Sequence, residues 1–127
     1  MKASALFLVA VLGLCAVVLA QEESDAIRPD EVSTEQVGQK VAVEGRVYSN
    51  SKSAAGIHLY FGPDTSTAFQ ALVQAKSLHK FQVDVAKKYD KRNVRVTGKL
   101  EEESGKYFIR IDEPSQIKVV AKKRETS

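Results

Sequence analysis

Two segments of the 127-residue chain share one pattern, in which valines alternate with polar residues and are followed by a glycine. They are residues 41–47 and residues 94–100, and a short basic stretch precedes each. Alternation with a period of two indicates half-buried β-strands. A glycine at the same place in both predicts a bulge or a sharp bend. Two bent strands far apart in the sequence are what a small closed barrel needs, so the pattern predicts an all-β barrel.

The first twenty residues differ in composition from the rest of the chain. Lys2 is followed by an apolar run over residues 3–20, and residues 18–20 form a small-residue cleavage site before Gln21. This is the pattern of a secretory signal peptide. We therefore expect an exported protein, secreted or periplasmic, with no stable membrane insertion after cleavage. The alternative is a retained anchor, because the run nearly reaches the roughly 20 residues of a membrane span.

The single cysteine, Cys15, lies inside this apolar run. A lipoprotein anchor needs a small residue before the cysteine, and Leu14 stands there. The mature chain would then have no disulfide, no thiolate nucleophile and no cysteine metal site. We expect residues 21–29 to be an acidic flexible lead, residues 30–120 one domain, and residues 121–127 a disordered basic tail.

Charge is distributed unevenly along the chain. Residues 21–36 hold six acidic residues and one arginine, a net charge of −5. Residues 37–127 hold 17 Lys and Arg against 10 Asp and Glu, a net charge of +7. A basic body favours anionic partners such as nucleic acid, anionic glycans or lipid headgroups. An ordinary solubilising surface would have the same composition, so charge alone does not choose between these readings.

Hydrophobic periodicity predicts the order of the elements. A short helix at about 30–37 leads into strands at about 39–50, 55–62 and 67–75, with a polar turn at 50–53. After Lys76 the apolar spacing becomes helical, so one helix or two helical turns are expected within 77–90. Strands follow at about 92–102 and from 106, and residues 115–120 can continue the pairing on an edge after Pro114.

Three strands, a helix and two further strands form the order of the OB-fold, a five-stranded Greek-key barrel with its helix between strands 3 and 4. The chain resembles the small exported bacterial OB-fold domains, which are related to the nucleic-acid-binding OB superfamily and also occur beside extracellular nuclease domains. The resemblance covers about 30–120. The residues that carry it are 37–47, 57–62, 69–73, 94–100 and 112–117.

Catalytic motifs are missing from the sequence. It has no G-x-S-x-G, no phosphate-binding glycine loop and no H-E-x-x-H. His58 and His79 lack ligand-like spacing, and the run at 101–103 reads as a solvated hairpin tip. We therefore expect a protein that is not an enzyme and that holds no metal or other cofactor.

Outward-facing basic and aromatic side chains are the better candidates for function. OB-fold proteins that bind single-stranded nucleic acid combine basic residues that follow the phosphate backbone with aromatic residues that stack on the nucleobases. The candidate ligand-binding residues are Arg46, Tyr48, Lys52, His58, Tyr60, Arg95, Lys99 and Arg110. Tyrosines also occupy half-exposed strand positions for packing alone.

Two functions from different classes follow. The first is a binding module for an anionic polymer, with single-stranded nucleic acid as the leading ligand. The second is an envelope module that binds a protein partner, or has a structural role, through the barrel face or a strand edge.

Overall fold

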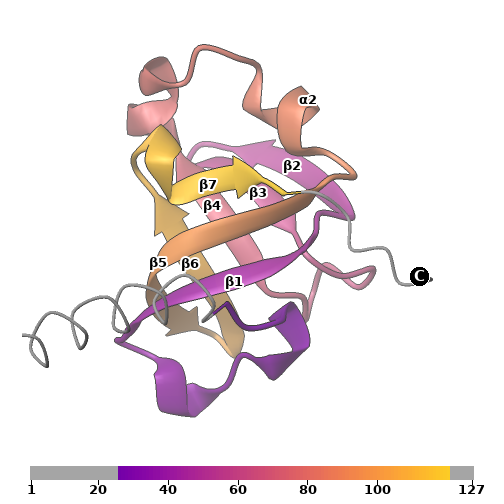
Figure 1. The fold of residues 1–127 in the computed structure, drawn as a ribbon, viewed down its shortest axis with the longest axis vertical. Coiled ribbons are helices and arrows are strands. Elements are labelled where there is room, and N and C mark those ends of the chain that lie inside the picture. Colours follow the sequence, from indigo (N-terminus) through magenta and orange to yellow (C-terminus); the bar gives the residue numbers. More distant parts are fainter. Residues whose placement is uncertain (1–25, 121–127) are drawn as a thin grey trace, which may run out of the picture.

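The computed structural model describes residues 26–120. The expected signal peptide (1–20), most of the acidic lead and the basic tail (121–127) lie outside the described residues. The described part is mostly β (Figure 1). Its strands are β1 (Lys40–Arg46), β2 (Ser49–Ser53), β3 (Gly56–Tyr60), β4 (Gln70–Gln74), β5 (Asn93–Glu103), β6 (Lys106–Ile111) and β7 (Ile117–Val119).

The helical elements are short. They are η1 (Pro29–Glu31), η2 (Thr34–Gln36), η3 (Ala75–Lys80), α2 (Val85–Tyr89) and η4 (Pro114–Gln116). The helix expected at 30–37 is thus two 3₁₀ turns, and in the second the Ser33 N–H donates to Gln36 Oε1 at 2.9 Å. The helical turns expected within 77–90 are η3, which begins earlier at Ala75, and α2. Asp84 caps α2 by accepting from the Lys87 N–H. No helix among the described residues is long and apolar enough to cross a bilayer.

Within the described residues the strands form one sheet in the order β1-β5-β6-β4-β3-β2, and β7 adds to β5. All pairs are antiparallel except β4 with β6, which is parallel. β1 and β2 are consecutive in the chain but stand at opposite ends of this path. The sheet is therefore not closed by pairing between its end strands.

The link between the two end strands is the dipeptide Val47–Tyr48. The Val47 N–H donates to Arg92 O at 2.9 Å, just before β5, and the Tyr48 N–H donates to Tyr60 O at 2.8 Å, on β3. The chain therefore changes its hydrogen-bonding partner from the start of β5 to β3 within two residues. The single strand predicted at 39–50 is in fact two strands, and the polar turn predicted at 50–53 belongs to β2.

The two repeated segments are direct partners. Val41 pairs with Gly98, Val43 with Val96, and Gly45 with Val94, in a register that runs from Lys40 to Arg46 without interruption. The bulges predicted at the glycines are therefore absent from the β1–β5 pairing in the described sheet. Each glycine instead makes room for another part of the molecule.

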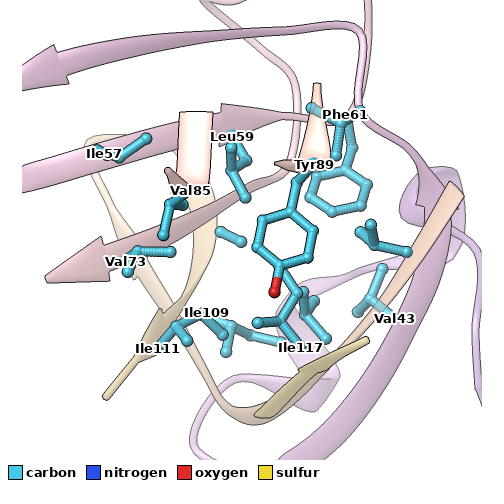
Figure 2. Packing of buried hydrophobic residues seen from close by; sticks show 14 of the residues in the cluster. Val43, Ile57, Leu59, Phe61, Val73, Val85, Tyr89, Ile109, Ile111 and Ile117 are labelled. Carbon is cyan, nitrogen blue, oxygen red and sulfur yellow. The ribbon is translucent and has the colours of Figure 1, made fainter. Parts of the chain in front are cut away.

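The core is one cluster that receives residues from every sheet strand except the edge strand β2. Val85 and Tyr89 lie four residues apart on α2 and are 2% and 3% exposed, so this short helix covers one end of the cluster. Figure 2 shows the Tyr89 ring pointing into the cluster, with Leu59, Val43 and Ile117 around it. The helical segment thus completes the core that the strands leave open.

Candidate functional site

The outer surface of β3, β4 and β6 carries two rows of side chains. His58 is opposite Leu72, and Leu72 is opposite Arg110. Tyr60 is opposite Gln70, and Gln70 is opposite Phe108. Because cross-strand partners share one side of a sheet, these residues form a common surface. We call it the strand face, made of His58, Tyr60, Gln70, Leu72, Phe108 and Arg110.

Strand alternation explains why these side chains point outward. The residues between them, such as Leu59, Ala71 and Ile109, are fully buried in the core. Leu72 and Phe108 are each only 8% exposed, although they stand outside the main core cluster. The strand face therefore has an apolar floor beneath its polar groups.

The ring of His58 is fixed by hydrogen bonds at both nitrogens. Its Nδ1 lies 2.8 Å from Gln70 Oε1 and its Nε2 lies 2.8 Å from Ser53 Oγ. Gln70 Oε1 can only accept, so Nδ1–H donates to it. Ser53 Oγ already accepts from the Ala55 N–H at 3.1 Å, so its hydroxyl is available to donate to Nε2. These contacts fit the tautomer that carries its proton on Nδ1.

Tyr60 continues the aromatic surface beside His58. The two rings stack with their centroids 6.2 Å apart and their planes at 10°. The Tyr60 hydroxyl lies 3.1 Å from Ser51 Oγ on the neighbouring strand β2. The pair therefore presents parallel, preorganised ring faces that lose little side-chain freedom on binding.

Arg110 lies across the other end of the strand face. Its guanidinium stands 5.3 Å from the centroid of the Phe108 ring, and its Nε donates to both carboxylate oxygens of Glu101 at 3.1 and 3.2 Å. Its Nη1 lies 3.5 Å from Gln74 Oε1. A ligand that recruits Arg110 must therefore compete with a half-exposed carboxylate.

A groove of about 360 Å³ crosses this surface. It lies between the turn before β3 and the β5–β6 hairpin, whose tip is Ser104-Gly105. Both tip residues have positive φ, 54° and 79°, as a two-residue hairpin turn requires. The groove is lined by Ala55, His58, Gln70, Leu72, Glu103, Ser104, Lys106, Phe108 and Arg110.

A second surface is formed by the outward side chains of β1, β5 and β7. Lys40 is opposite Lys99, and Arg95 is opposite both Glu44 and Lys118. We call it the basic sheet face, made of Lys40, Arg95, Lys99 and Lys118. It contains a hollow of about 740 Å³, lined by Lys40, Ala42, Arg95, Thr97, Gly98, Glu113, Ser115, Gln116 and Lys118.

The candidates named from the sequence are divided between these surfaces. The strand face holds His58, Tyr60 and Arg110, and the basic sheet face holds Arg95 and Lys99. Arg46 is exposed at the end of β1, opposite Asn93.

Two further candidates lie on neither surface. Tyr48 is 44% exposed in the link between β1 and β2. Lys52 pairs with the inward-facing Ile57, so it lies on the side of β2 opposite His58. That is also the side of Asn50, whose Nδ2 donates to Ala86 O and Asp90 Oδ1 at the helical segment. The expected single face is therefore two surfaces, with Arg46, Tyr48 and Lys52 outside both.

Gln70 and Lys118 were not among the candidates, although they contact or extend these surfaces. Gln70 lies between Phe69 and Ala71 in an alternating segment, which is a signal for an outward position. Lys118 gave no comparable signal, because its place depends on the pairing of β7 with β5, in which its partner Arg95 lies 23 residues earlier in the sequence. Among the described residues there is no group of three or more His, Cys, Asp or Glu that could hold a metal ion.

Comparison with known proteins gives the class of fold. No protein-family model matches the chain, and no curated protein matches it. Among solved structures, it is similar to the OBody AM1L10 bound to hen egg-white lysozyme, with a TM-score of 0.57, 20% identity, and 78% of this chain and 94% of that chain covered. The OBody AM3L15 bound to hen egg-white lysozyme matches with a TM-score of 0.56, 18% identity, and coverage of 78% and 96%.

Part of a natural enzyme is similar in fold to this chain. Asparaginyl-tRNA synthetase from Pyrococcus horikoshii matches with a TM-score of 0.54 and 22% identity over 74% of this chain. The match covers 22% of the synthetase, so the chain spans about a fifth of that protein. Identities at this level concern the fold alone. The described residues therefore have an all-β, OB-like fold.

Proposed function

We propose that this protein binds single-stranded nucleic acid on the strand face. The observation that carries the proposal is the groove between the turn before β3 and the β5–β6 hairpin, floored by β3, β4 and β6. OB-folds bind oligonucleotides and oligosaccharides on the corresponding strands, between the corresponding loops. The presence of this fold in a tRNA synthetase also supports a nucleic acid as the ligand.

The chemistry of the strand face, which includes Tyr60 beside the groove, suits stacking more than charge pairing. The parallel rings of His58 and Tyr60 offer a platform on which bases of any sequence can stack. Arg110 and Lys106 supply positive charge for the backbone, while Glu101 and Glu103 offset much of it. We therefore propose binding with little sequence preference and with modest affinity for short strands.

The test is fluorescence anisotropy with a labelled oligothymidylate, titrated across a range of salt concentrations. Affinity should fall as salt rises, because each phosphate contact releases counterions. Tyr60→Ala should weaken binding by about 1–3 kcal/mol, that is, about 5-fold or more. Tyr48→Ala, which removes an exposed tyrosine outside the strand face, is the matched control. Absence of binding at low salt, or equal affinities for Tyr60→Ala and wild type, would contradict the proposal.

A protein ligand is the second candidate. The OBodies similar to this chain are bound to lysozyme, which shows that an OB-like fold can bind a protein. One sheet edge is already covered here, because Ile27 exchanges backbone hydrogen bonds of 2.8 and 2.9 Å with Ala42 and Glu44 of β1. Co-purification of a partner that resists nuclease treatment would favour this function over the first.

We also propose that the protein is exported and that it is not an enzyme. The apolar run at 3–20 supports export, and the missing catalytic motifs support a binding role. Mass spectrometry of the protein from a fractionated culture should find a chain that begins at Gln21 outside the cytoplasm. Cleavage of the labelled strand by highly purified protein would overturn the non-catalytic role.

A further inference from the structure

The basic sheet face brings like charges directly opposite each other. Lys40 faces Lys99 across the β1–β5 pair, and Arg95 faces Lys118 across the β5–β7 pair. The Cβ atoms of such partners are about 5 Å apart, and like charges at this separation destabilise a sheet. The Lys40–Lys99 pair is therefore a stability cost that binding of an anion would offset.

The acidic groups nearby compensate only part of this charge. Glu44 is opposite Arg95, and Glu113, which lines the hollow, is engaged by Lys80 at 2.7 Å. Within the described residues, Lys40, Lys99 and Lys118 form no ion pair with an acidic side chain. The ammonium groups of Lys40, Lys99 and Lys118 are therefore available to an external anion.

The basic sheet face adjoins the strand face. Leu100 on β5 pairs with Ile109 on β6, so the next residues in this register are Lys99 on β5 and Arg110 on β6. We call the boundary between these two strands the seam. Gln116 fills that seam, since its Nε2 donates to Thr97 O at 2.9 Å and to Arg110 O at 3.1 Å. A chain lying in the groove can thus pass from Arg110 to Lys99 without leaving the surface of the protein.

We propose that the basic sheet face extends the strand-face site and binds the phosphate backbone of the part of a longer single strand that leaves the groove. This inference rests on the function proposed above. The hollow has no aromatic residue in its lining, so it offers charge without stacking. It would therefore add affinity and salt dependence without reading bases.

The test compares two oligothymidylates, of about 5 and about 15 nucleotides, within the range of site sizes known for OB-folds. The double variant Lys40→Gln/Lys118→Gln removes one charge from each like-charged pair. Its affinity for the long probe should fall towards that for the short probe. The slope of log K against log salt for the long probe should decrease by about 1.4, or about 0.7 for each lost contact. Binding of the short probe should not change.

The matched control is Lys76→Gln/Lys87→Gln, which removes the same charge from exposed residues of η3 and α2. It should leave the long probe bound as in the wild type. An equal effect of the two double variants, an equal loss for both probes, or an unchanged long probe would overturn the extension. The extension would also be wrong if Lys40→Gln/Lys118→Gln bound both oligothymidylates as the wild type does and lost affinity only for a sulfated glycan.

The two proposals fail in different ways. If the wild type does not bind the short probe at low salt, the function proposed for the strand face is wrong, and the extension fails with it. If the short probe binds and Tyr60→Ala weakens it while Lys40→Gln/Lys118→Gln leaves the long probe unchanged, only the extension is wrong.

Discussion

Gly98 lies two residues before Leu100, where the pairing of β5 with β6 begins. A Cβ at this position would lie 2.8 Å from Ile109 Cγ2 and 3.1 Å from Gln116 Nε2. A Cβ at Gly45 would lie 2.6 Å from Pro29 Cγ. Both glycines are thus needed for close packing against a third segment. The repeated pattern located both positions, but the segments that press on them come from elsewhere in the chain.

Gly98→Ala should lower the free energy of unfolding by about 1–3 kcal/mol, because the added methyl group overpacks a buried isoleucine. Gly45→Ala should cost less, since Pro29 is half-buried in a short N-terminal segment that can shift. Urea unfolding followed by circular dichroism measures both. A larger loss for Gly45→Ala would show that the N-terminal segment is the more rigid neighbour.

Because of Tyr89, the free energy of unfolding should depend on pH in the alkaline range. Burial raises the pKa of its phenol above the ordinary value of about 10. The neutral phenol is thus favoured in the folded protein, and its contribution is complete below pH 10 and is lost as pH rises through the higher folded pKa. Between about pH 8 and about pH 11, wild type should therefore lose more unfolding free energy than Tyr89→Phe. Tyr48→Phe, at an exposed tyrosine, should behave as wild type, and equal losses for all three proteins would contradict the assignment.

At the scale of elements, alternation in the sequence located most strands but did not show where β1 ends and β2 begins. Alternation around Ile57, Val73 and Val96 gave β3, β4 and β5 within a few residues. It gave one strand where β1 and β2 stand, because the change of partner at Val47–Tyr48 depends on Arg92 and Tyr60, which are distant in sequence. Polar Asn50 suggested a turn, whereas its amide is held by the helical segment.

The side chain of Gln116 links β5, β6 and the residues before η4. Its Oε1 accepts from the Asp112 and Glu113 N–H groups at 2.8 and 3.0 Å, while its Nε2 donates to Thr97 O and Arg110 O. Gln116→Ala leaves these backbone groups without their partner, so it should cost about 2 kcal/mol or more. Gln82→Ala, at an exposed position, should cost under about 0.5 kcal/mol. Equal urea midpoints would show that water replaces the amide without loss.

At the scale of the whole molecule, the candidate site was only partly predictable. Alternation showed that Tyr60, Arg95 and Arg110 point away from the core, which needs only local information. It could not show that Arg95 and Tyr60 lie on different surfaces. That division follows from the order of strands in the sheet, and the pairing of β1 with β5 joins residues about 50 positions apart.

The strand face and the basic sheet face are built on one core, because the same buried cluster contains residues of β1, β3, β4, β5, β6 and β7. We therefore expect residues 26–120 to unfold in one cooperative transition, with far-UV and tyrosine near-UV circular dichroism giving the same midpoint. A ligand on either face should stabilise the entire unit. At a free oligothymidylate concentration of 100 times Kd, the unfolding free energy should rise by about 2.7 kcal/mol by both probes. Two separate transitions, or a shift seen by one probe alone, would mean that the two faces belong to units that open independently, and a strand could then not use both as one continuous site.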